Sequence, residues 1–204
     1  MEGKSAVKVG EYRSYIFDLD GTLFSIPVDW AGVRREISAL VGEDFSDTPL
    51  FLKLQQLAAS KPGMRERLLS VIDSYELRAV GSAKAMPGAS ELLYSLFEVA
   101  RIALVTLQGK KACGEILQKH KLDDLFEAVV TREDSMDRSE QLLIALNRLG
   151  AEARATLFTG DRLNDVVCAR KVGLDVALVG RDAVKDPKPN YNFASLVELR
   201  AYLA

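Results

Sequence analysis

The 204-residue sequence contains few of the residues that mark disulfide-rich or histidine-based proteins, with two cysteines and one histidine. Cys113 and Cys168 stand alone within helical patterns, so we expect reduced, packed thiols rather than a disulfide or a metal-binding pair. His120 closes a predicted helix, where a capping or surface role is expected rather than catalysis. The chemistry of this chain is therefore expected from other side chains.

Charge of one sign and long apolar runs are also lacking. The formal net charge is −2, and Lys and Arg form no local cluster, so a nucleic-acid partner is not expected. No run approaches the roughly 18 apolar residues of a membrane span, because Arg101 interrupts the nearest candidate. Residues 1–11 are polar and lack the apolar core of a signal peptide. We expect a protein with no membrane partner that stays in the cytoplasm.

Two carboxylates follow a short apolar run near the start of the chain. Residues 14–17 lead directly into Asp18 and Asp20, and Gly21 comes next. This pattern is typical of a buried strand that stops at a turn. In a parallel α/β sheet, ligands bind at the carboxyl ends of the strands.

Two carboxylates that converge at such a strand end need a compensating positive charge. Magnesium is the simplest candidate, because it binds through one or two carboxylates and completes its shell with water and phosphate oxygens. An acidic turn or an isolated calcium loop is the alternative. A calcium loop is disfavoured because apolar residues and a proline occupy the positions where it needs oxygen ligands, namely Leu23, Phe24, Ile26 and Pro27.

The rest of the chain has two kinds of pattern. Residues 27–86 have no strand-like run and carry three apolar stripes at helical spacing, whereas strands and helices alternate from residue 87 onward. Repeated strand–helix units predict a doubly wound parallel sheet with helices on both faces. We therefore predict an α/β core domain formed by residues 1–26 and 87–204, and an inserted all-helical domain of residues 27–86. The expected core strands after the first are 102–106, 128–130, 155–158 and 176–179, and the expected core helices are 92–97, 112–120, 139–149, 163–172 and one that begins at Ser195.

The string Asp18-Leu19-Asp20-Gly21-Thr22 resembles the first motif of the haloacid dehalogenase (HAD) superfamily of phosphohydrolases. Thr106, at the end of a predicted strand, resembles the second motif, a Thr or Ser that hydrogen-bonds a phosphoryl oxygen. Gly160-Asp161, followed four residues later by Asp165, resembles the fourth motif. The inserted helices resemble the small cap that many members carry over the active site. The resemblance covers nearly the whole chain from Tyr12 onward and implies a Rossmann-like core.

The resemblance also implies roles for individual residues. Asp18 is expected to be the nucleophile that takes the phosphoryl group as an aspartyl phosphate, and Asp20 the general acid and base. Magnesium would be held by Asp18, Asp161 and the main-chain carbonyl of Asp20, with Asp165 helping directly or through water. The dehalogenases proper lack an acid at the position of Asp20, so phosphate chemistry is favoured. Residues expected to bind the phosphate group are Thr106, Leu107 and Gln108.

One departure from the family pattern concerns its third motif, a lysine. This chain has no lysine between Lys121 and Lys171, and the usual spacing leads to Met136. Arg138 is the nearest cation and could hold a phosphoryl group bidentately, although arginine and lysine are not equivalent in geometry. A surface position for Arg138 is the alternative, in which case Lys110 or Lys111 could supply the positive charge.

The resulting hypothesis is a magnesium-dependent phosphatase, similar to the phosphoglycolate phosphatase group, that hydrolyses a small-molecule phosphomonoester. A phosphomutase shares these motifs and is the second hypothesis. A third is a regulatory or binding module with weakened catalysis, which the missing lysine motivates.

Overall fold

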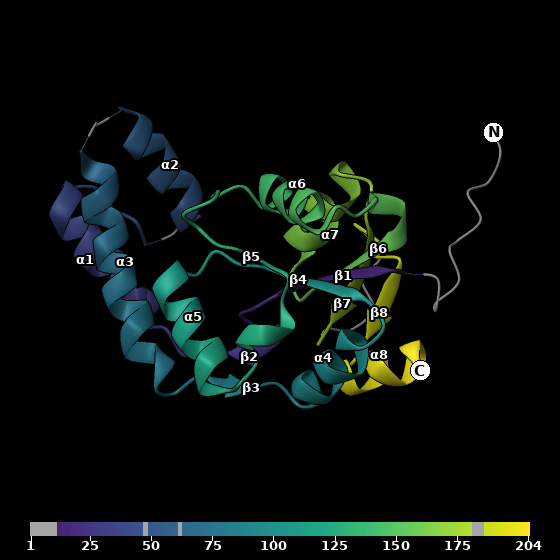
Figure 1. Cartoon of the computed structure of the whole chain (residues 1–204). Helices are drawn as coiled ribbons and strands as arrows, with labels where there is room; N and C mark the ends of the chain where they lie inside the picture. Colours follow the sequence, from purple (N-terminus) through teal and green to yellow (C-terminus); the bar gives the residue numbers. More distant parts are fainter. Residues whose placement is uncertain (1–11, 47–48, 61–62, 181–185) are drawn as a thin grey trace.

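The computed structural model describes residues 12–46, 49–60, 63–180 and 186–204. Its main feature is a six-stranded sheet in the order β5-β4-β1-β6-β7-β8, in which every neighbouring pair is parallel. The strands of this sheet are β1 (Ser14–Asp18), β4 (Arg101–Val105), β5 (Ala128–Val130), β6 (Thr156–Gly160), β7 (Asp175–Val179) and β8 (Tyr191–Phe193). Figure 1 shows the sheet lying between layers of helices. The prediction of a doubly wound parallel sheet is confirmed.

Side-chain alternation along the central strand explains why helices cover both faces. Successive residues of a strand point to opposite faces, and in β1 Tyr15 and Phe17 belong to one buried cluster whereas Ile16 belongs to the other. The first cluster includes side chains from α4 (Ala89–Phe97), α5 (Lys110–Lys119) and α8 (Leu196–Leu203), and the second includes side chains from α6 (Arg138–Leu149) and α7 (Leu163–Lys171). A strand buried on both faces needs apolar residues at successive positions, which β1 has at its centre, in residues 15–17.

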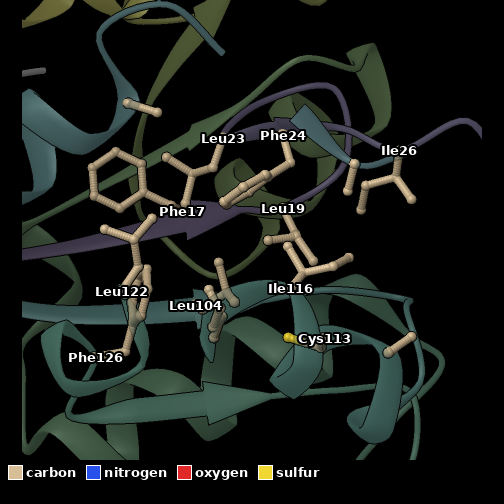
Figure 2. Packing of buried hydrophobic residues seen from close by; sticks show 14 of the residues in the cluster. Phe17, Leu19, Leu23, Phe24, Ile26, Leu104, Cys113, Ile116, Leu122 and Phe126 are labelled. Atoms are coloured by element: carbon tan, nitrogen blue, oxygen red, sulfur yellow. The ribbon is translucent and has the colours of Figure 1, made fainter. Parts of the chain in front are cut away.

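Figure 2 shows part of the first cluster, where Phe17 and Leu104 of the sheet lie with Cys113 and Ile116 of α5. Cys113 is buried and Cys168 is partly exposed, and both are free thiols. Packing of this kind fixes α5, whose first residues follow the end of β4.

Three helices lie between β1 and the rest of the sheet along the chain: α1 (Trp30–Val41), α2 (Leu50–Ser60) and α3 (Met64–Val80). The longest, α3, packs against α1, α2 and α5, and Figure 1 shows the three helices grouped beside α5 at one end of the molecule. Their positions agree with the three predicted apolar stripes.

The structure adds strands that the sequence did not predict. The two-residue strands β2 (Phe24–Ser25) and β3 (Lys84–Ala85) pair antiparallel, so the two ends of the helical segment meet in a short hairpin-like ladder. Segment 27–86 therefore contains one short strand besides its helices. β8 was also missed, because Tyr-Asn-Phe is too short to give a periodic pattern.

No helix in the described part of the chain is long and apolar enough to cross a membrane. The sequence expectation about a signal peptide concerns residues 1–11, which lie outside the described residues.

Candidate active site

The ends of three neighbouring strands bring together the residues singled out by the motifs. Asp18 is the last residue of β1 and is in register with Val105, the last residue of β4. β6 lies on the other side of β1 and ends at Gly160. Thr106 and Asp161, which directly follow β4 and β6, are therefore adjacent to Asp18 at the carboxyl edge of the sheet, where α/β proteins bind ligands.

The turn after β1 comes so close to β6 that one position must be glycine. Gly21 has φ +87°, and a Cβ atom built there would lie 2.5 Å from Oδ2 of Asp161. Only glycine combines this left-handed conformation with the absence of a side chain. The glycine of the first motif thus lets two acidic loops approach each other.

Arg138, at the first turn of α6, reaches two of the predicted site residues. Its Nη2 lies 2.5 Å from Oδ1 of Asp18, and its Nε lies 3.3 Å from Oδ1 of Asp165. Its side chain is 9% exposed, so the alternative of a surface arginine is wrong. Lys110 and Lys111, the other candidate cations, begin α5 with exposed side chains.

Gln141, one helical turn after Arg138, holds this arginine in place and was not singled out from the sequence. Its fully buried amide group donates to the carbonyl of Thr106 (2.7 Å) and to that of Ser135 (2.8 Å), and it accepts from Nη1 of Arg138 (3.1 Å). The start of α6 is thereby tied to the end of β4. The only sequence signal was a polar residue on the apolar face of a predicted helix.

Three carboxylates and one arginine dominate the electrostatics of the site. Burial raises the pKa of Asp18, the charge of Arg138 opposes this shift, and the nearby Asp165 and Asp161 raise the pKa further. The raised pKa of Asp18 despite the charge of Arg138 means that the protein's own cations compensate the negative charge around this carboxylate incompletely. A bound cation would complete the compensation.

Asp20 follows Asp18 by two residues and is partly exposed. Its Oδ1 accepts a hydrogen bond from the main-chain N–H of Ile26 at 3.1 Å. Burial raises its pKa, partly opposed by that hydrogen bond and by the charge of Arg162. A carboxyl group with a raised pKa is suited to hold and release a proton.

The oxygen donors at this edge fit magnesium in chemistry. In the described part of the chain, no three histidine, cysteine or acidic side chains are gathered closely enough to hold a metal by themselves. Magnesium does not require such a cage, because it keeps several waters and takes phosphate oxygens as ligands. The residues that could hold it are Asp18 and Asp161, the main-chain carbonyl of Asp20, and Asp165.

A small cavity of about 50 Å³, large enough to hold water, is lined by Asp18. The predicted residues that line it are Asp18, Asp20, Thr106, Leu107, Gln108 and Arg138. Gln108 is also fixed through its main chain, which donates to Oγ1 of Thr106 at 3.0 Å. The cavity is therefore bounded by the first and second motifs and by Arg138, whereas the predicted metal ligands Asp161 and Asp165 do not line it.

Three residues that the sequence did not point to complete the wall of this cavity: Trp30, Phe51 and Arg162. Trp30 comes from α1 and Phe51 from α2, and their rings meet edge to face with centroids 6.1 Å apart. Both follow the apolar helical spacing of residues 27–86, and this spacing alone gave no signal for a role at a site.

The comparisons with known proteins agree with this arrangement. A phosphoglycolate phosphatase of Synechococcus elongatus is 24% identical over 79% of this chain and 81% of its own length. A haloacid dehalogenase-like hydrolase domain-containing protein of Arabidopsis thaliana is 24% identical over 94% of this chain and 83% of its own length. The solved structure of a haloacid dehalogenase-like family hydrolase from Streptococcus pneumoniae has the same fold, with a TM-score of 0.72 at 16% identity, covering 95% of this chain and 99% of the other.

Other similarities are partial. The chain spans 56% of the pyrophosphatase PpaX of Halalkalibacterium halodurans, at 28% identity, and only 16% of an imidazoleglycerol-phosphate dehydratase of Phytophthora nicotianae, at 35% identity. The sequence model of the haloacid dehalogenase-like hydrolases matches residues 15–179, which include all three strand-end motifs and the helices between them. The chain therefore belongs to the haloacid dehalogenase-like hydrolase family.

Proposed function

We propose that this protein is a magnesium-dependent phosphatase that hydrolyses a small-molecule phosphomonoester through an aspartyl phosphate on Asp18. The observation that carries the proposal is the contact of 2.5 Å between Asp18 and Arg138 at the end of β1. It supplies a buried carboxylate nucleophile with a fixed orientation and a cation for the phosphoryl group. The name of one relative, phosphoglycolate phosphatase, supports a phosphoric monoester hydrolase.

The two oxygens of Asp18 have different surroundings, which suits a nucleophile. Oδ1 is held by Arg138, whereas Oδ2 accepts, from the residues that the structure describes, a single long hydrogen bond of 3.5 Å from the hydroxyl of Thr22. In the first half-reaction Asp18 attacks phosphorus, and Asp20 gives a proton to the leaving alcohol oxygen. In the second, Asp20 takes a proton from the water that attacks the aspartyl phosphate, which releases inorganic phosphate and restores Asp18.

Positive charge on the equatorial phosphoryl oxygens is the main requirement of phosphoryl transfer. Arg138 provides part of it and replaces the missing family lysine, while Thr106 and the main chain of the loop that follows β4 hold the phosphoryl oxygens. Magnesium, held by Asp18, Asp161 and the carbonyl of Asp20 with help from Asp165, would supply further positive charge.

We propose that the helical segment 27–86 acts as a movable cap that selects the substrate. Trp30 and Phe51 support this role because they come from this segment and line the same cavity as Asp18 and Thr106. The protein would act in the cytoplasm, on a soluble phosphate ester.

The alternatives make different predictions. A phosphomutase with the same motifs would depend on a bisphosphate activator. A module with weakened catalysis, motivated by the missing lysine, would hydrolyse no phosphate ester; the contact of Arg138 with Asp18 supports the phosphatase instead.

The test is turnover of p-nitrophenyl phosphate and of a panel of small phosphate metabolites with magnesium present. Asp18→Asn should lower activity by several orders of magnitude, whereas Asp124→Asn, an exposed acid on the 3₁₀ turn Asp123–Leu125, should have no effect. Hydrolysis by folded Asp18→Asn at near the parent rate would contradict the proposed mechanism.

A further inference from the structure

Arg132 is a buried charge that the proposed chemistry does not use. It follows β5 in a loop of the core, and its side chain is 1% exposed. Arginine is almost never fully buried unless it is paired. Here both partners come from α3: Nη1 lies 2.7 Å from Oε1 of Glu76, and Nη2 lies 2.5 Å from Oδ1 of Asp73. Glu76 is itself fully buried, so the charges of Arg132 and Glu76 face each other away from water, whereas Asp73 is 46% exposed.

The same groups reach the loop after β4. Nη1 of Arg132 donates to the carbonyl of Leu107 at 2.8 Å, and Oε2 of Glu76 accepts from the N–H of Gly109 at 2.9 Å. A Cβ atom on Gly109 would lie 2.7 Å from both Arg132 and Asp73, so this loop is packed directly against the charges. Three segments distant in sequence thus meet: α3, the loop after β4, and the loop after β5.

Stability alone does not account for such a cluster. Desolvating two charges is costly, and a well-packed apolar pair of similar volume is often as stable or more stable. What an apolar pair cannot provide is a donor for one main-chain group of the loop and an acceptor for another. The charged groups therefore fix the orientation of the loop after β4, whose Leu107 and Gln108 line the cavity.

The cluster also borders the aromatic wall of the cavity. The guanidinium carbon of Arg132 lies 5.9 Å from the ring centroid of Phe51, on α2. α3 packs along both α2 and α5, and Figure 1 shows these helices side by side between the sheet and α1. A change in the position of α3 would therefore alter the cavity in two ways, through Phe51 on α2 and through the loop after β4.

We propose that Arg132 and Glu76 are positioning residues, which seat α3 against the core and hold the loop Leu107–Gly109 in the orientation that binds the phosphoryl group. This inference rests on the proposed phosphatase function for its effect on turnover. Neither residue touches the substrate. Their contribution is the geometry of the loop and of the adjacent aromatic wall.

The test replaces the pair in two ways that both remove the charge. Arg132→Met with Glu76→Leu leaves no acceptor for the N–H of Gly109, whereas Arg132→Met with Glu76→Gln keeps an amide oxygen for it. We expect both double variants to fold, with kcat for p-nitrophenyl phosphate at least tenfold below the parent in the Leu variant and partly recovered in the Gln variant. If the pair only fills space, the Leu variant should be as active as the parent.

A matched control removes an ion pair far from the site. Arg101 and Glu127 form a pair at 2.9 Å near the other end of the strands, and Arg101→Met with Glu127→Leu should leave kcat unchanged. An equal loss of kcat in this control would assign the effect to lost ion pairs in general and overturn the proposal.

Amide hydrogen exchange gives a readout that is independent of turnover. The amide of Gly109 should exchange at least tenfold faster in the Leu variant than in the Gln variant, while the amides of α6 stay as in the parent. Unchanged exchange at Gly109 would overturn the positioning role even if the parent proved to have no phosphatase activity. Absence of parent turnover with accelerated exchange would instead contradict the proposed function and leave the positioning of the loop supported.

Discussion

Replacing Arg138 tests how this chain manages without the family lysine. Arg138 contacts Asp18 at 2.5 Å and Asp165 at 3.3 Å from a side chain that is 9% exposed. Arg138→Ala would leave two buried carboxylates without their shared counter-charge and would remove a preorganised donor from the phosphoryl oxygens. Loss of one such donor lowers kcat by about 10²–10³, or roughly 2.7–4 kcal/mol of transition-state stabilisation.

The loss of activity in Arg138→Ala should appear as a lower kcat rather than as a higher KM, because the charge of Arg138 stabilises the transition state more than the bound substrate. Arg138→Lys should recover only part of the loss, because a compact ammonium group on a flexible stem lacks the rigid fork with which the guanidinium contacts Asp18 and Asp165. Arg148→Ala is the control on the same helix, where the side chain is 42% exposed and pairs with Asp134. The assay is steady-state hydrolysis of p-nitrophenyl phosphate with saturating magnesium.

A rate for Arg138→Ala within about twofold of the parent would refute this reasoning, since the loss predicted for one preorganised donor is at least a hundredfold. The alanine variants of Lys110 and Lys111, measured in the same assay, would then show which cation replaces the lysine. The thermal midpoint of each variant should be recorded, so that a loss of folding is not mistaken for a loss of catalysis.

Three further predictions concern the residue that holds Arg138, the aromatic residues that line the cavity, and the metal. Gln141→Leu should lower kcat about tenfold with little change in KM, because the amide that holds Arg138 and the carbonyl of Thr106 is lost; a kcat equal to that of the parent would contradict this. Trp30→Ala and Phe51→Ala should broaden the range of accepted phosphate esters and raise KM for the best substrate, and unchanged selectivity across the panel would count against the proposed cap. Removing divalent cations with EDTA should abolish turnover, and added magnesium should restore it; full activity in EDTA would rule out the proposed cofactor.

Much of the core was predictable because its signals are local. The apolar residues before Asp18 predicted a buried strand, which is β1. The predicted alternation of strands and helices after residue 87 is observed as β4, β5, β6 and β7 with the helices between them. The motifs placed Asp18, Thr106 and Asp161 at strand ends, and parallel pairing then brings those ends to one edge of the sheet.

What could not be predicted depends on packing between distant segments. The sequence left Arg138 as either a surface residue or a substitute cation, and its burial is decided by Gln141 and by the start of α6. Arg132 and Glu76 are 56 residues apart, and each alone is an ordinary charged residue in a loop or helix. Trp30 and Phe51 follow the helical apolar pattern, so their contact with the cavity had no separate signal.

The central claim is that Asp18 carries the phosphoryl group during the reaction. The most direct measurement is rapid acid quenching of the enzyme with magnesium and a ³²P-labelled phosphomonoester, followed by digestion and identification of the labelled peptide. The account predicts transient label on the peptide that contains Asp18, removable by hydroxylamine as expected for an acyl phosphate. It also predicts no label in Asp18→Asn. Rapid turnover of the same substrate without any label on that peptide, or label on another residue, would contradict the account.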